Sequence, residues 1–358
     1  IGHHVRQCRS FYVYILIMKN LITLLSLFFI PLSVWSTCVV EFKASGHDLT
    51  KMTKTSDLLI DLHDDGRFFP LKEVLGQLKS PIQYSLQKIN HIDEKSDDYD
   101  DRYIKYYRYA RVLEFLQEQQ TTFTANNYQI QTIGKSLDGR DLKVVFPKEL
   151  DPNKKLIVMF GRHHGDEGTA NWIIEGFVNE FFSRSKTLEG YQLVLYPMVN
   201  PDGAENRVRY NNNRRDLNRV WGQDSRQSKD EIQFIHQHLN QVVLSSGLTP
   251  VITLDMHGSF DEDFIYRVGK RTFGLEYYET QQTFIDELGT LDPWQAANFI
   301  LSEGNPGMAR IRLASLHGWH TLTHETPRDI PLNNRRNRSL QSLKEQGVAA
   351  LDTIETLY

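Results

Sequence analysis

Two histidines and two acids follow one apolar run near the middle of the chain. The run covers residues 156–160, and the polar sequence GRHHGDE comes directly after it. His164 and Glu167 have the spacing H-x-x-E, which lets an imidazole and a carboxylate meet at one metal ion. His163 and Asp166 offer a competing register. The spacing alone is a weak signal, because a histidine and an acid often share a loop. A metal site therefore needs further residues from elsewhere in the chain.

Two other apolar runs also end next to residues that could do chemistry. Residues 250–256 precede His257, and residues 318–323 precede Glu325. Two histidines and one glutamate would leave the fourth position of a zinc ion open, which is typical of a catalytic site. A carboxylate at such a site can take a proton from water and pass it to a leaving amine. The alternatives are that His257 is an ordinary core or surface histidine and that Glu325 only pairs with Arg328.

A third polar segment, RYNNNRRDLNRVW at residues 209–221, supplies cations and an amide. Asn218 and Arg219 could hold a substrate carboxylate, because the planar guanidinium matches a carboxylate with two hydrogen bonds. Arg209 could support an oxyanion as it develops. Asp216 could accept the free N–H of a metal-bound histidine and so orient the ring. The competing interpretation of this segment is a solvated arginine loop.

The surrounding pattern predicts the elements that position these residues. Apolar runs with strand character alternate with segments of helical spacing, which indicates an α/β protein with helices on both faces of a sheet. Strands are predicted at residues 128–146 (a hairpin), 155–160, 191–199, 250–256 and 318–323, and helices at 103–119, 169–184, 229–243 and 340–357. Because ligands bind at the carboxyl ends of strands in such sheets, the polar residues at the run ends are expected to converge. The pattern of residues 260–310 does not define an order of elements.

The length, charge and cysteine content argue against several classes of protein. The chain has 358 residues and a net charge of −4, so no basic field indicates nucleic acid as a partner. Cys8 and Cys38 are the two cysteines, too few for a disulfide framework or a cysteine-rich zinc site.

The beginning of the sequence predicts a targeting segment. We expect residues 1–17 to be upstream translation and residues 18–36 to be a signal peptide, with a basic start, a short apolar core and small residues before the cut. The mature protein would then be secreted or periplasmic and would keep no stable membrane span. An uncleaved anchor helix is the alternative. Residues 37–100 are expected to be an accessory domain or a pro-segment, ahead of a catalytic domain at 103–358.

Taken together and in order, the motifs resemble the zinc carboxypeptidase family of the carboxypeptidase A type. The resemblance covers roughly residues 103–357 and rests on the following elements: IGKSLDGR at 133–140, GRHHGDE at 161–167, NPDG at 200–203, RYN at 209–211, DLNR at 216–219, His257, and THET at 323–326. The family's G-x-x-H-x-x-E element selects His164 and Glu167 over the competing register.

The resemblance implies a fold and a cofactor. The fold is a three-layer α/β/α sandwich with a mixed, mostly parallel, twisted sheet. The cofactor is one Zn²⁺ per chain, bound by His164, Glu167 and His257 at the carboxyl edge of that sheet. Asp216 would accept the free N–H of a zinc-bound histidine.

The resemblance also implies an activity and its residues. The activity is hydrolysis of a peptide bond next to a free C-terminal carboxylate. Glu325 would activate water, and Arg209 would stabilise the tetrahedral oxyanion. Asn218 and Arg219 would hold the terminal carboxylate of the peptide.

The short HGDE loop and the predicted signal peptide look most like the bacterial murein peptide amidase and peptidoglycan carboxypeptidase branches. Cell-wall peptides are therefore the expected substrate class. Arg310 or Arg312 falls near the family's side-chain pocket residue, which would favour an acidic or carboxylate-bearing terminal residue. The chain departs from the family at Arg214, where glycine is frequent, and it has no tyrosine within residues 300–324 to cap the substrate.

Two other functions remain open on the sequence. One is a zinc-dependent deacylase of N-acyl amino acids, similar to aspartoacylase. The other is a non-catalytic protein that binds peptide termini. The NPDG and IGKS elements favour the carboxypeptidase over the deacylase, and Glu325 argues against a simple binder.

Overall fold

A computed structural model of the protein describes residues 107–223, 230–259, 262–327 and 339–358, together with four short strands nearer the N-terminus. The chain divides into two compact units, residues 1–94 and 95–358. In the first unit, β1 (Val40–Ala44) pairs in parallel with β4 (Tyr84–Lys88), and β2 (Leu59–Asp61) pairs antiparallel with β3 (Phe68–Pro70). The predicted signal peptide and the segment before it lie outside the described residues.

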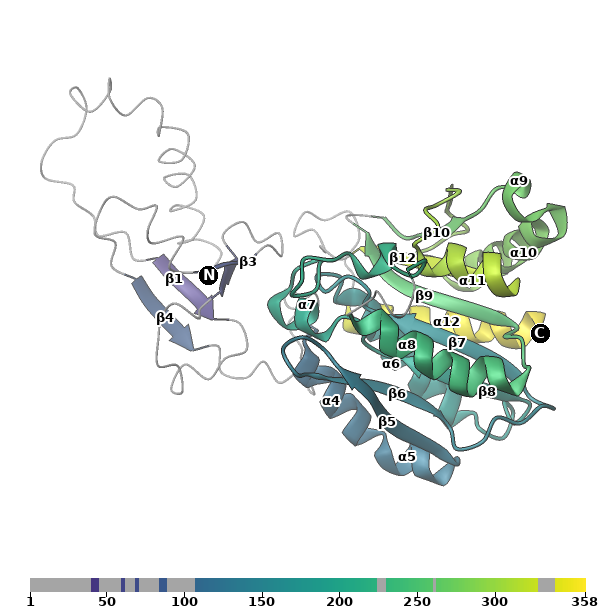
Figure 1. The fold of residues 1–358 in the computed structure, drawn as a ribbon, viewed down its shortest axis with the longest axis horizontal. Helices are drawn as coiled ribbons and strands as arrows, with labels where there is room; N and C mark the ends of the chain where they lie inside the picture. Colours follow the sequence, from purple (N-terminus) through teal and green to yellow (C-terminus); the bar gives the residue numbers. More distant parts are fainter. Residues whose placement is uncertain are drawn as a thin grey trace, which may run out of the picture. The chain divides into compact units, whose positions relative to one another are not determined.

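Eight strands form the sheet of the second unit (Figure 1). In chain order they are β5 (Tyr128–Lys135), β6 (Asp141–Pro147), β7 (Lys155–Gly161), β8 (Tyr191–Tyr196), β9 (Ile252–Ser259), β10 (Phe264–Arg267), β11 (Phe299–Leu301) and β12 (Thr321–Pro327). Their spatial order is β11-β10-β12-β9-β7-β8-β6-β5. The central strands β12, β9, β7 and β8 are parallel to one another, whereas β5 and β6 are antiparallel to their neighbours and β10 is antiparallel to β12. This confirms the expected mixed, mostly parallel sheet.

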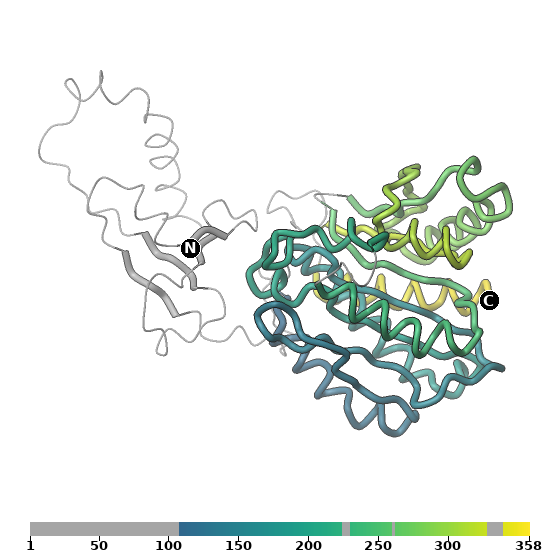
Figure 2. The backbone as a smooth tube through the Cα atoms, in the orientation of Figure 1, coloured from purple at the N-terminus to yellow at the C-terminus, as the bar shows by residue number. Residues whose placement is uncertain are grey.

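Helices cover both faces of the sheet. Alternate side chains of β7 point to opposite faces. Those of Val158 and Phe160 pack in one cluster with Ile232 of α8 (Glu231–His238), while on the other face a Cβ at Gly161 would meet Ile174 of α6 (Thr169–Ser183). The C-terminal helix α12 (Leu340–Leu357) packs directly on α6, and the backbone trace in Figure 2 shows it returning across the sheet. The result is the expected three-layer sandwich.

The remaining helices are shorter or lie at the edges. They are α4 (Tyr109–Glu118), α5 (Gln120–Ala125), α7 (Pro201–Asn206), η4 (Leu217–Arg219), η5 (Leu239–Val243), η6 (Leu244–Ser246), α9 (Lys270–Phe273), α10 (Leu275–Leu291) and α11 (Ala309–His317). Within the described part of the chain, no helix combines the length and apolarity needed to cross a bilayer.

Two strand predictions end too early. The runs at 250–256 and 318–323 stop before His257 and Glu325, but the structure continues β9 to Ser259 and β12 to Pro327. The reason is that the parallel ladder between these two strands persists to their ends, where Glu325 is paired with His257. Both side chains therefore stand on strands, which hold them more firmly than loops would.

Candidate metal centre

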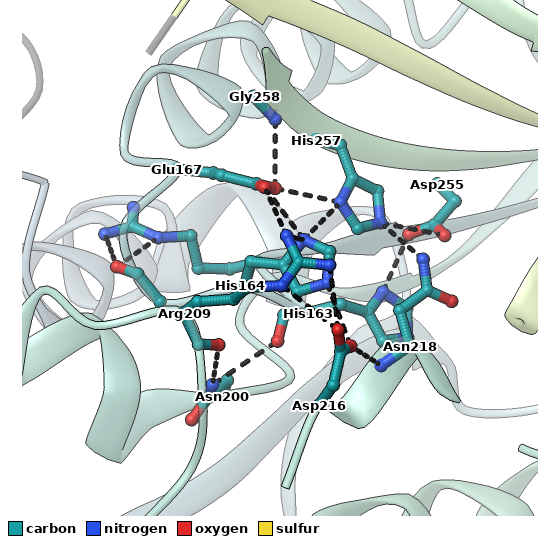
Figure 3. Close-up of polar contacts among 12 residues, drawn as sticks. His163, His164, Glu167, Asn200, Arg209, Asp216, Asn218, Asp255, His257 and Gly258 are labelled. Carbon is teal, nitrogen blue, oxygen red and sulfur yellow. Dashed lines mark hydrogen bonds and ion pairs between the residues drawn. The ribbon is translucent and has the colours of Figure 1, made fainter. Parts of the chain in front are cut away.

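Glu167 lies between two histidines at the carboxyl edge of the sheet (Figure 3). Its Oε1 is 2.8 Å from Nδ1 of His164, and its Oε2 is 2.8 Å from Nδ1 of His257. The two Nδ1 atoms are 3.1 Å apart. All three residues are buried, with at most 4% of their surface exposed. The structure thus brings together the three residues that the sequence proposes as ligands, although His257 is more than ninety positions from the first histidine.

The donor set fits a zinc ion. Imidazole nitrogen and carboxylate oxygen are ordinary zinc ligands, and bonds of about 2.0–2.2 Å to a tetrahedral ion place the ligand atoms roughly 3.3–3.6 Å apart. The observed separations of 2.8 to 3.1 Å are shorter than this by roughly 0.2–0.8 Å, so the side chains need to move apart by less than an ångström to admit the ion. The electrostatic environment of the cluster also favours a cation. Burial opposes a charge on His257, but Asp255 and Glu167 outweigh it and raise the pKa of this imidazole, so the cluster favours positive charge.

The loop that carries His164 is held by the NPDG turn. Asn200 begins α7, where its side chain accepts a hydrogen bond of 2.9 Å from the N–H of Gly203. Its Nδ2 donates to the carbonyl of His163 at 3.3 Å and to that of Arg209 at 3.2 Å (Figure 3). One amide therefore connects the loop of the metal ligands with the start of the arginine segment.

The IGKSLDGR motif supports the same turn from the other side. Asp202, in the first turn of α7, accepts hydrogen bonds from Ser136 Oγ at 2.6 Å, from Arg140 Nη1 at 2.7 Å and from the N–H of Asp138 at 3.0 Å. Its side chain is fully buried. Two motifs that are distant in sequence thus form a single support beneath the metal-binding loop.

Asp216 contacts both His164 and Arg209. Its Oδ1 lies 3.0 Å from Nε2 of His164, and its Oδ2 accepts hydrogen bonds of 3.0 and 2.8 Å from Nε and Nη2 of Arg209. Burial opposes ionisation of this carboxyl, but the hydrogen bond with His164 and the charge of Arg209 outweigh it and lower the pKa. An ionised Asp216 at Nε2 leaves Nδ1 of His164 facing Glu167, which is the orientation that a metal ligand needs.

Arg209 places a positive charge at the cluster itself. Its Nη1 is 3.2 Å from Nδ1 of His164 and 3.8 Å from Oε1 of Glu167. About a third of the side chain is exposed, so the guanidinium can also meet a substrate.

Asn218 and Arg219 differ in their surroundings. Asn218 is buried, with its Oδ1 accepting from the N–H of Ala309 at 2.9 Å and its Nδ2 lying 3.1 Å from Nε2 of His257. Arg219 is exposed, and its Nη1 donates to the carbonyl of Asn218 at 2.8 Å. The arginine is therefore open to a ligand, whereas the amide lies against a metal ligand.

Glu325 lies beside the cluster through strand pairing. Its Cα partner in β9 is His257, so both side chains project from the same face of the sheet. Burial, followed by the negative charge of Glu167, raises the pKa of Glu325 to about 7 against the opposing effect of His257. A carboxyl with such a pKa is suited to proton transfer near neutral pH.

The competing register, His163 with Asp166, is excluded because His163 has a different partner. His163 does not pair with Asp166. Its Nδ1 is 2.7 Å from Oδ1 of Asp255, a residue that sequence reasoning missed. Together with His257 these two side chains form a second group of potential ligands among the described residues. A signal was present, since Asp255 is two positions before His257 and a strand turns such residues to the same face.

The profile of the family described as zinc carboxypeptidase matches residues 112–353 of this chain.

The chain belongs to the zinc carboxypeptidase family.

Curated relatives of this zinc carboxypeptidase are distant. Human cytosolic carboxypeptidase 2 is 23% identical over 244 residues, which cover 63% of this chain and 27% of the human protein. The metallocarboxypeptidase A-like protein of Trichophyton verrucosum is 28% identical over 135 residues, or 32% of each chain. The chain therefore spans about a quarter to a third of the length of these relatives.

Solved structures share its fold. The metallo-carboxypeptidase from Pseudomonas aeruginosa aligns with a TM-score of 0.59 and 21% identity, covering 69% of this chain and 68% of the other. The metallo-carboxypeptidase from Burkholderia cenocepacia aligns with a TM-score of 0.58 and 20% identity, covering 68% and 67%. The fold expected from the sequence is thereby confirmed.

The structure separates the two arginines proposed for the pocket of this zinc carboxypeptidase. Arg310 is 3% exposed, and its guanidinium lies 5.5 Å from the ring centre of Tyr266. The charges of Arg310, Glu325 and Arg219 all affect the pKa of the Tyr266 hydroxyl, so these groups lie near one another. Arg312 instead acts on His236 of α8, where burial and then this arginine lower the pKa to about 4.

Tyr266 was not singled out in the sequence. It stands on β10, opposite Thr323 of β12 and two residues from the partner of Glu325. Burial and then the charge of Glu325 raise the pKa of its hydroxyl. The absence of a tyrosine from residues 300–324 therefore does not leave the neighbourhood of Glu325 without a phenol.

Proposed function

We propose that this protein is a metallocarboxypeptidase, which removes the last residue of a peptide with a free C-terminal carboxylate. The observation that carries the proposal is the register of β9 and β12. It places Glu325 next to His257, within a buried cluster of two histidines and one glutamate. A metal-binding protein without catalysis has no need of a buried carboxyl with a raised pKa at this position.

The side chains divide the reaction between them. Zinc at His164, Glu167 and His257 would supply a Lewis acid that polarises a carbonyl and lowers the pKa of water. Glu325 takes the proton from the attacking water and delivers it to the nitrogen of the leaving residue. Its raised pKa suits both steps, because the same group must accept and release a proton near neutral pH.

Two arginines bind the negatively charged groups of the reaction. Arg209, oriented by two hydrogen bonds to Asp216, holds a positive charge beside the cluster where the oxyanion develops. Arg219 is exposed near the site and binds the terminal carboxylate of the peptide, with Asn218 next to it.

The proposed terminal residue is acidic or carries a side-chain carboxylate. Arg310 donates to the carbonyl and to Oγ of Ser302 at 3.0 and 3.1 Å, and within the described residues it forms no ion pair with a carboxylate. A buried cation that lacks a counter-ion gains from a ligand that brings one. Glutamate and diaminopimelate, which occur in cell-wall peptides, have this chemistry, as expected for the murein peptide amidase and peptidoglycan carboxypeptidase branches.

The proposed substrate class also depends on where the protein is located. The leader pattern of residues 18–36 supports export to the periplasm or the medium, where cell-wall peptides are accessible. The division of the chain after residue 94 supports a separate role for residues 37–100, as an accessory domain or a pro-segment.

Peptides with free and with amidated C-termini test the activity. The purified protein should release the last residue of the free peptide, and amidation should abolish release because Arg219 loses the carboxylate. Mass spectrometry of the products, with purified muropeptides as a second substrate set, identifies the bond that is cut. Cleavage of N-acyl amino acids alone would indicate the deacylase instead, and binding without any cleavage would indicate a peptide-binding protein.

The variant Glu325→Gln tests the base. Loss of a general base costs typically 10²–10⁴-fold in rate. We expect a loss in kcat of that order, while the zinc content measured by atomic absorption stays at one per chain. Hydrolysis at the native rate by this variant would refute the assignment.

A further inference from the structure

Three buried side chains form a chain of contacts behind His257. Nε1 of Trp221 donates to Nε2 of His163 at 3.0 Å, and Nδ1 of His163 is 2.7 Å from Oδ1 of Asp255. Oδ2 of Asp255 lies 3.0 Å from Nε2 of His257. All four side chains are at most 1% exposed. None of the three residues behind His257 has a role in the reaction described above.

The donors and acceptors from Trp221 to Asp255 have a single consistent assignment. An indole N–H can only donate, so Nε2 of His163 must be an acceptor without a proton. A neutral imidazole then carries its proton on Nδ1 and donates it to Asp255. Asp255 therefore receives a hydrogen bond on one oxygen and turns its other oxygen toward the metal ligand.

The same contacts limit the orientation of His257. Its ring is stacked against that of His163, with 5.5 Å between the centres and 2° between the planes. Nε2 of His257 faces Asp255 and the amide of Asn218, which leaves Nδ1 to face Glu167. Carboxylates behind metal-bound histidines raise the basicity of the ligand and fix its ring.

We propose that His163 and Trp221 are positioning residues that orient Asp255 and, through it, hold His257 ready for zinc. The inference rests on the zinc site of the proposed function but not on any substrate. It gives His163, the first histidine of the GRHHGDE loop, a different task from His164. His164 coordinates the metal, whereas His163 supports a ligand on a neighbouring strand.

The alternative use of these residues is a second metal site. His163, Asp255 and His257 lie close enough to share an ion. Such a site would have to break the hydrogen bond from Trp221 or the one to Asp255, because both ring nitrogens of His163 are already engaged. It would also need His257 to serve two ions at once. The hydrogen-bonded arrangement requires neither change.

Zinc affinity and zinc stoichiometry test the proposal. Loss of such an outer partner typically weakens metal binding 10–100-fold. We expect His163→Phe, which keeps an aromatic ring but no nitrogen, to bind one zinc with a Kd raised by that factor in competition with a chelator. Trp221→Phe should show a smaller increase. The matched control is His236→Phe, since His236 also contacts the indole of Trp221, at 5.0 Å between ring centres, but is not in the chain of contacts.

The tautomer provides a second readout that does not need a variant. Nitrogen-15 NMR of the zinc-loaded native protein should show His163 with its proton on Nδ1. A proton on Nε2, native zinc affinity in His163→Phe, or two zinc ions per native chain with one lost in that variant would each overturn the proposal. If the native protein binds one zinc but cleaves no peptide, the proposed function fails and this inference stands.

Discussion

At the scale of single residues, two arginines of α11 that are two positions apart have opposite surroundings. Arg310 is buried near Tyr266 and the site, whereas Arg312 acts on His236 on the other side of the helix. Such a separation follows from helical geometry, because residues two apart point in nearly opposite directions. Under the proposed function, Arg310 is therefore the one of the two that is expected to contact the side chain of a substrate.

This contrast predicts a change in substrate preference. Arg310→Met should lower kcat/KM for peptides ending in glutamate by about 10–100-fold relative to peptides ending in alanine, because a charge-assisted hydrogen bond is worth about 1.5–3 kcal/mol. Arg312→Met, the matched control, should leave the ratio unchanged. Comparing kcat/KM for the two substrates cancels any general loss of activity that occurs because Ser302 no longer contacts Arg310. An unchanged ratio in the Arg310 variant would show that the pocket does not select acids.

At the scale of elements, close packing of α6 against α12 depends on glycine. A Cβ at Gly347 would lie 2.1 Å from the carbonyl oxygen of Ile173, and one at Gly176 would lie 2.1 Å from that of Lys344. Both obstacles are backbone atoms of the opposite helix, which cannot move as a flexible side chain can. The two helices cover the sheet face opposite α8, so their spacing affects the layer that supports β7.

The variant Gly347→Ala sets two effects against each other. Helix propensity alone favours alanine by about 1 kcal/mol. Overpacking typically costs about 1–3 kcal/mol or more. We expect the clash to prevail and the melting temperature to fall by several degrees. Gly190→Ala, with no atom within 4 Å of the added carbon, should change it little. A rise in melting temperature for the first variant would mean that the helices are further apart than the structure shows.

At the scale of the whole molecule, the metal ligands connect elements that are distant in sequence. His164 and Glu167 follow β7, while His257 is part of β9, and Asp216 reaches the cluster from the arginine segment. An ion bound by these groups stabilises the folded state only, because the unfolded chain does not bring them together. Zinc should therefore contribute to global stability as well as to catalysis.

Removal of zinc should lower the melting temperature. Binding stabilises by RT ln(1 + [L]/Kd), which is about 4 kcal/mol at a ligand concentration of 1,000 Kd. Calorimetric scans of the dialysed protein, with a chelator and after zinc is added back, measure the effect. His257→Ala should remove the response to zinc. A native protein whose melting temperature and peptide hydrolysis both ignore chelators would contradict the metal site.

The sequence by itself determined what depends on neighbouring residues. The spacing of His164 and Glu167, the apolar runs of the central strands and the amphipathic helices are local patterns, and they sufficed for the fold class and the main ligand candidates. They did not define the order of residues 260–310, where short elements such as β10 and β11 at the edge of the sheet have weak periodicity.

The tertiary structure decided what depends on strand pairing and packing. The ladder between β9 and β12 sets Glu325, the base expected from the sequence, beside His257. His163 reaches Asp255 from the loop that follows β7. The choice of Arg310 over Arg312 was likewise made by contacts with β10. These relations join residues that are far apart in sequence, so their energies act only after the chain has folded.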